Sequence, residues 1–138
     1  MVKSGSVRYD PKDVPMTNPH RVLLVDDEPL LLGVVRRIVE AKQPGARVVY
    51  ACDAATAMWQ LQSTSIRLVV TDLRMNADDL AGLKVVEAAR SAGVPVAILS
   101  GAASSVLEQL AAQDITVVPK DEKMKDRLAT LVASAFEA

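Results

Sequence analysis

The chain has 138 residues, half of them hydrophobic, with 16 Lys and Arg against 17 Asp and Glu. This length suits one domain that buries a substantial core by itself, and the net charge of −1 argues against broad binding to nucleic acid or to an anionic membrane. The single cysteine, Cys52, excludes an intramolecular disulfide and fits a reducing compartment, and we interpret it as a buried packing residue.

The sequence carries no signal for a membrane or for export. A membrane span needs about 20 apolar residues, and the longest uncharged segment, 91–107, is interrupted by Gly93 and Pro95. The N-terminus has no signal-peptide core. These features predict a cytoplasmic protein that makes no membrane contact.

Residues 1–20 differ from the rest of the chain in composition. They contain Pro11, Pro15 and Pro19 and follow neither the helical nor the strand period, which is typical of a flexible terminal tail. The domain is therefore expected to span residues 21–138, which leaves no residues for an attached output domain.

From Val22 onward, short apolar runs alternate with helical patterns. The gaps between the runs are long enough for crossover helices, and this alternation predicts an α/β fold. The predicted strands are Val22–Val25, Arg47–Ala51, Leu68–Thr71, Val94–Leu99 and Ile115–Val118.

The five helices that the pattern predicts have recognisable ends. Pro29 suits a first helical position, Asp53 is the expected cap of the second helix, and Gly93 lies near the end of the third. Pro44-Gly45 stops the first helix, and the last helix starts after Asp121. The side chains expected to pack are Leu31, Val34, Val35 and Ile38; Ala57, Met58 and Leu61; Leu83, Val86 and Ala89; Val106, Leu107, Leu110 and Ala111; and Met124, Leu128, Leu131, Val132 and Ala135.

Right-handed crossovers allow few arrangements of five parallel strands. The commonest compact one is a doubly wound five-stranded parallel sheet of order 2-1-3-4-5 with helices on both faces, the flavodoxin-like fold. The first and third strands are then neighbours. Their carboxyl ends flank the crevice in which such sheets bind ligands.

Polar residues follow four of the predicted strands. Asp26-Asp27 ends the first, Asp72 the third, Ser100 the fourth, and Lys120 comes after the fifth. Two like charges about 4 Å apart repel by about 4 kcal/mol at an effective dielectric of 20. The acidic residues are therefore expected to need a cation.

These residues, in this order and context, resemble the receiver domain of two-component response regulators, in the superfamily of the chemotaxis regulator. The resemblance covers about Arg21 to Ala138, and the ordered set of motifs is much more specific than any one of them. It implies a phosphoprotein of phosphorelay signal transduction rather than an enzyme, in which Asp72 accepts a phosphoryl group from a histidine kinase or a phosphotransfer protein.

The resemblance also implies a magnesium site. Asp27 and Asp72 would ligate Mg²⁺ directly, Asp26 through water, and Arg74 through its backbone carbonyl.

The remaining family roles concern the phosphorylated state. Lys120 and Ser100 would contact the phosphoryl oxygens. Phosphorylation would then repack the face formed by the fourth helix, fifth strand and fifth helix, and so recruit a downstream output protein. No direct contact with nucleic acid is expected, and the last two helices could pair two copies as a homodimer.

Each motif also has an ordinary structural interpretation. Asp26-Asp27 can cap a helix, Asp72 can occupy a turn, Ser100 can begin a loop, and Lys120 can be a solvated charge. Three further functions stay open for the whole chain. These are a receiver excised from a larger regulator with DNA-binding or enzymatic output, a receiver-like binding module that is never phosphorylated, and a metal-dependent phosphatase, although phosphatases usually show Asp-x-Asp after the first strand.

Two segments depart from the family pattern. The loop from Arg74 to Gly82 is two residues longer than usual, lacks a proline near Asn76 and carries Asp78 and Asp79. We interpret it as a surface insertion, and the alternative that it alters metal access or kinase docking stays open.

Around the fifth strand, Asp121 stands where the family usually has proline, so we predict a trans peptide bond after Lys120. Val117 replaces the aromatic switch residue. Arg74 and Ala102 occupy the positions that flank the attacking water in the family, and Arg74 is expected to set the phosphoryl lifetime.

Overall fold

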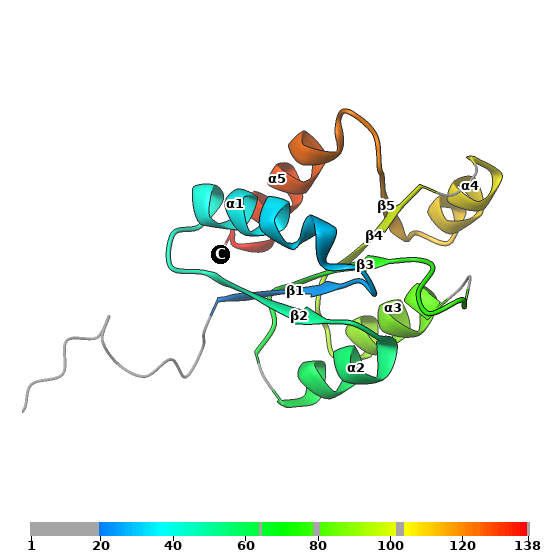
Figure 1. The fold of residues 1–138 in the computed structure, drawn as a ribbon, viewed down its shortest axis with the longest axis horizontal. Helices are drawn as coiled ribbons and strands as arrows, with labels where there is room; N and C mark the ends of the chain where they lie inside the picture. Colours follow the sequence, from blue (N-terminus) through cyan, green and yellow to red (C-terminus); the bar gives the residue numbers. More distant parts are fainter. Residues whose placement is uncertain (1–19, 64, 79–80, 102–103, 138) are drawn as a thin grey trace, which may run out of the picture.

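The computed structural model describes residues 20–63, 65–78, 81–101 and 104–137 (Figure 1). The predicted tail, apart from His20, lies outside these residues, as do Asp79 and Ala102. The predicted packing of the Val106 and Leu107 side chains also lies outside the description.

Five parallel strands form one sheet in the order β2-β1-β3-β4-β5, which confirms the predicted fold class. The sequence pattern located every strand to within two residues. The observed strands are β1 (Arg21–Val25), β2 (Arg47–Ala51), β3 (Leu68–Asp72), β4 (Val96–Ser100) and β5 (Thr116–Pro119).

Two strands begin later than predicted, for the same reason. The N–H of Val94 donates to the carbonyl of Ala89 at 2.9 Å, and the N–H of Ile115 donates to the carbonyl of Leu110 at 3.1 Å. Both residues therefore complete the end of the preceding helix before the chain enters the sheet.

Helices cover both faces of the sheet (Figure 1). The helices α1 (Leu32–Lys42) and α5 (Met124–Ala135) lie on one face, and α2 (Ala54–Ser63) and α3 (Ala81–Ser91) lie on the other. The helix α4 (Ser104–Ala112) packs beside β5 through Leu110, which joins the α3 side of the core. A 3₁₀ turn, η2 (Pro29–Leu31), precedes α1.

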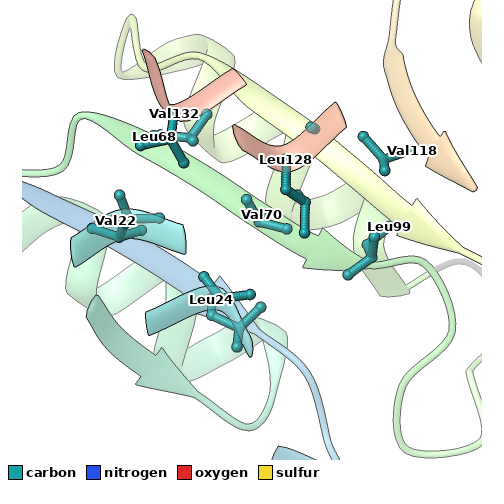
Figure 2. Close-up of a cluster of buried hydrophobic side chains, with 11 residues drawn as sticks. Val22, Leu24, Leu68, Val70, Leu99, Val118, Leu128 and Val132 are labelled. Atoms are coloured by element: carbon teal, nitrogen blue, oxygen red, sulfur yellow. The ribbon is translucent and has the colours of Figure 1, made fainter. Parts of the chain in front are cut away.

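The central strands are buried on both faces because helices cover both sides of a parallel sheet. In β1, Val22 and Leu24 pack toward α1 and α5, whereas Leu23 and Val25 pack toward α2 and α3. Figure 2 shows the first of these clusters, in which Leu24 lies with β3, β4, β5 and α5 side chains. The strand period of two thus divides the buried side chains of β1 between the two faces of the sheet.

Most predicted helix ends are confirmed. The Asp53 carboxylate accepts the N–H of Thr56 at 2.7 Å, a cap that lowers the pKa of Asp53. Gly45 and Gly93 have φ of 92° and 73°, the left-handed conformation that lets glycine follow a helix. The predicted stripe of α5 is confirmed, since Leu128 and Val132 are its buried residues.

Three predicted burials are wrong. Cys52 is exposed, because it lies in the short connection between β2 and the cap of α2 rather than in either element. Met58 is 39% exposed, because Ala57 occupies the buried face of α2 and the next residue is turned about 100° around the helix. Ala111 is exposed for the same reason beside buried Leu110.

Candidate functional site

The acidic residues meet at the carboxyl edge of the sheet. Val25 in β1 lies opposite Thr71 in β3, so the residues that follow them leave the sheet side by side. One carboxylate oxygen from each of Asp26, Asp27 and Asp72 lies within 4.8 Å of the other two. The structure therefore brings together the three carboxylates that the sequence analysis singled out.

Asp26 is the buried member of this cluster, with only 4% of its surface exposed. Its carboxylate accepts the N–H of Glu28 at 2.9 Å, and the hydroxyl of Tyr50 donates to its backbone carbonyl. Burial raises the pKa of Asp26, and the charges of Asp72 and Asp27 raise it further, against the opposing effects of the Glu28 amide and Lys120. Negative charge is therefore costly at this position.

Asp72 lies at the end of β3 beside a cation. One oxygen, Oδ1, accepts the N–H of Leu73 at 3.0 Å and lies 3.4 Å from the Nζ atom of Lys120. The backbone N–H of Lys120 in turn donates to the carbonyl of Ser100 at 3.0 Å. Ser100 is 3% exposed and pairs with Pro119 in the neighbouring strand, so the ends of β4 and β5 are joined next to the cluster.

Asp27, by contrast, is exposed, and its Oδ2 atom accepts the backbone N–H of Asn76 at 3.0 Å. The side-chain amide of Asn76 also donates to the carbonyl of Cys52 at 3.3 Å. In the sequence, Asn76 stands out only for the absence of a proline, and these contacts are not predicted from it. The usable signal was the residue type, because asparagine tolerates the left-handed conformation found in tight turns.

The longer loop after β3 is a folded turn. Met75 and Asp78 exchange two backbone hydrogen bonds of 3.0 and 2.9 Å around Asn76 and Ala77, which have φ of 54° and 64°. Two consecutive left-handed residues are typical of a type I′ turn. Because Met75 is also fully buried, the interpretation of this loop as a simple surface insertion is incomplete.

Gly82 closes the same loop against the site. Its N–H donates to the carbonyl of Leu73 at 2.8 Å, and a Cβ atom at this position would lie 2.3 Å from the backbone oxygen of Asp72. A side chain would therefore displace the backbone of the candidate phosphoacceptor.

Asp121, in the place of the usual proline, holds the turn that follows Lys120. Its carboxylate accepts the N–H of Lys123 at 2.9 Å and lies 3.3 Å from Nη1 of Arg127. The described residues contain no cis peptide bond, so the predicted trans bond between Lys120 and Asp121 is confirmed. Arg74 is exposed and lies two residues beyond Asp72.

Comparison with known proteins identifies the family of this fold and site. Residues 22–132 match the family model described as the response regulator receiver domain. The chain belongs to this family. It is thus a signalling domain of two-component systems, in agreement with the resemblance found in the sequence.

A curated relative agrees with this assignment. The chain is 34% identical over 87 residues to the nitrate/nitrite response regulator protein NarP of Escherichia coli K12, a match that covers 62% of this chain and 39% of NarP. The chain therefore spans well under half of that relative.

Solved structures share the fold. A response regulator from Hahella chejuensis has a TM-score of 0.70 at 22% identity over 86% of this chain and 96% of that one. A CheY-like receiver domain protein from Methanospirillum hungatei JF-1 has a TM-score of 0.68 at 20% identity over 86% and 94%. No helix in the described part of this receiver domain has the length and apolar character needed to cross a membrane.

Proposed function

We propose that Asp72 of this receiver domain accepts a phosphoryl group from a histidine kinase or a phosphotransfer protein. The observation that carries this proposal is the position of its carboxylate, which lies 3.4 Å from the Lys120 ammonium and within the cluster formed with Asp26 and Asp27. A carboxylate next to a cation and a metal-binding cluster suits phosphoryl transfer, which depends mainly on positioning and charge neutralisation.

The donor set fits Mg²⁺. Three carboxylates converge within 4.8 Å. Burial raises the pKa of Asp26, and the charges of Asp72 and Asp27 add to the increase, so a cation at this position would lower the cost of negative charge. Hard oxygen donors that leave room for water suit this cation. We propose that Mg²⁺ is bound by Asp26, Asp27, Asp72 and the backbone carbonyl of Arg74. Bound Mg²⁺ would neutralise charge on the phosphoryl oxygens.

In the proposed step, an oxygen of Asp72 attacks the phosphorus of a phosphohistidine. A phosphorus–oxygen bond forms, the phosphorus–nitrogen bond breaks, and the departing imidazole nitrogen takes up a proton from solvent. Lys120 offers a positive charge to one phosphoryl oxygen, and the Ser100 hydroxyl donates to another.

The phosphorylated state is proposed to signal by protein contact. A phosphoryl group that draws in Lys120 also acts on β4, because the Lys120 N–H is bonded to the Ser100 carbonyl at 3.0 Å. The two strand ends would move together and alter the α4–β5–α5 face, which we propose binds a downstream output protein or a second copy of the chain. Half-buried Val117 would report the change by packing rather than by an aromatic swing.

The test is intact-mass measurement after incubation with acetyl phosphate and Mg²⁺. The unsubstituted chain should gain one phosphoryl adduct, and Asp72→Asn should abolish it. Asp78→Asn is the matched control, since Asp78 is an exposed carboxylate of the adjacent turn whose ion pair joins it to Lys84 at 3.8 Å. It should retain the adduct.

Two outcomes would contradict phosphorylation at Asp72. An adduct that persists in Asp72→Asn would place the acceptor elsewhere, and a chain that gains none would favour the receiver-like binding module.

Partner capture with and without beryllofluoride, a phosphoryl mimic, then tests the output step. Direct binding of the chain to DNA would contradict output by protein contact.

A further inference from the structure

One residue joins three loops at the carboxyl edge of the sheet. Asn76, in the loop after β3, donates its backbone N–H to Asp27 Oδ2 at 3.0 Å and its side-chain amide to the Cys52 carbonyl at 3.3 Å. Asp27 belongs to the loop after β1, and Cys52 to the loop after β2. Asn76 thus connects its own loop to two segments that lie 49 and 24 residues away in the chain.

The turn around Asn76 fixes the direction of its N–H. Met75 and Asp78 exchange two backbone hydrogen bonds across the turn, and Met75 is buried in the core on the α2 and α3 side of the sheet. The left-handed φ of 54° at Asn76 is inaccessible to proline, whose ring holds φ near −65° and which has no N–H to donate. The contact with Asp27 therefore depends on a non-proline residue in this conformation.

Asp27 is the carboxylate of the cluster that most needs such support. It is exposed, and Asp26 and Asp72 repel it through charge, so an unrestrained side chain would turn toward solvent. A hydrogen bond from an N–H to a charged oxygen is among the stronger ones and opposes this rotation. It engages only Oδ2, so Oδ1 is left for another partner.

We propose that Asn76 is a positioning residue for the metal site. Its N–H holds the Asp27 carboxylate toward Asp26 and Asp72, and its side chain ties the turn to the loop after β2. This inference rests on the proposed magnesium-dependent function and assigns a role within it to the longer loop. Loss of a residue that hydrogen-bonds to a metal ligand typically weakens metal affinity by about 10-fold to 100-fold.

The first test measures Mg²⁺ affinity by calorimetry. Asn76→Pro removes both hydrogen bonds and should weaken binding by about 10-fold or more. Asn76→Gly keeps the backbone donor and permits the left-handed φ, so it should retain affinity within about threefold. Ala77→Gly, the control in the same turn, should bind Mg²⁺ like the unsubstituted chain.

The second test needs no metal and no substitution of Asn76. The exposed Asn76 amide should exchange with solvent at least about 10-fold more slowly in the unsubstituted chain than in Asp27→Ala, as followed by amide resonances. This signature reports the bond itself, so it decides the case even where Asn76→Pro fails to fold.

The outcomes separate this inference from the proposed function. Equal Mg²⁺ affinity in folded Asn76→Pro, or an Asn76 amide unaffected by Asp27→Ala, would overturn the role of Asn76 while the phosphoryl adduct at Asp72 still forms. If the unsubstituted chain bound no Mg²⁺, the proposed function and this inference would both be wrong.

Discussion

At the scale of single residues, the ionised carboxylate of Asp26 lowers the stability of the metal-free folded domain. The residue is 4% exposed, and burial together with the charges of Asp72 and Asp27 raises its pKa above the ordinary value of 3.8. The folded chain therefore binds the Asp26 proton more tightly than the unfolded chain does. Without metal, stability falls as pH rises from the unfolded pKa to the folded pKa, and it stays lower above both.

Asp26→Asn should stabilise the metal-free domain near neutral pH. The amide stays neutral and can still accept the Glu28 N–H, so the free energy of unfolding should rise by about 1–2 kcal/mol in urea titrations. The gain should shrink as the pH falls toward the unfolded pKa, because the native carboxyl is then protonated too.

Saturating Mg²⁺ provides the control for this substitution. The unsubstituted chain should gain about 2.7 kcal/mol at a Mg²⁺ concentration 100 times its Kd, and Asp26→Asn should gain less. A substituted chain that is less stable than the original at neutral pH without metal would contradict the electrostatic argument.

At the scale of elements, the short connections after the strands hold the side chains of the candidate site in place. The loop after β3 is closed at one end by the Met75–Asp78 turn and at the other by Gly82 against Leu73. The turn after β5 is held by the Asp121 carboxylate on the Lys123 N–H. Asp72 and Lys120, at the ends of β3 and β5, thus depend on hydrogen bonds that begin in the following loops.

Gly82→Ala should disturb Asp72 through the backbone. The added Cβ would lie 2.3 Å from the Asp72 oxygen and 2.8 Å from Leu73 Cα, so one of the two segments must shift. We expect a loss of about 1–3 kcal/mol in the free energy of unfolding and a slower gain of the phosphoryl adduct.

Gly33→Ala is the matched glycine control for this prediction. Gly33 lies in α1, and the nearest atom to an added Cβ is the flexible end of Arg37 at 4.0 Å. This change should stabilise the domain by about 0.5–1 kcal/mol, because alanine favours the helix. Equal effects of the two substitutions would show that the close contact at Gly82 does not matter.

At the scale of the whole molecule, one sheet with two faces supports the site. The strands β1 and β3 lie inside the sheet and are buried on both faces. The residues at their carboxyl ends therefore extend from well-packed strands. The candidate site thus lies at the ends of strands that the core holds on both faces.

Leu24→Ala tests how much this core contributes to stability. Leu24 lies two residues before Asp26, is 1% exposed and belongs to the buried cluster that α1 and α5 share with the sheet. Figure 2 labels it in that cluster. The cavity should cost about 3–5 kcal/mol in urea unfolding, a large share of the stability of a typical domain. Leu30→Ala, at a residue 78% exposed, should change stability by less than about 0.5 kcal/mol. Similar losses in both would contradict this account of the core.

The sequence alone determined the strand order and the edge of the sheet that carries the candidate site. The alternation of apolar runs and helical stripes predicted the strand order, because hydrophobic period records which faces are buried and crossover handedness restricts the winding. The residues that end those runs, among them Asp26, Asp72 and Lys120, identified the edge that carries the candidate site.

Only the tertiary structure decided how these groups are held. The Asn76 contact with Asp27 spans 49 residues and depends on a left-handed turn. The residue type of Asn76 could indicate the turn but not its distant partner. The exposure of Cys52 and Met58 likewise follows from the packing of α2 and of the loop before it. The physical reason is that period and residue type describe local conformation and burial, whereas contacts between distant loops depend on backbone dihedrals that each loop adopts only when the others are in place.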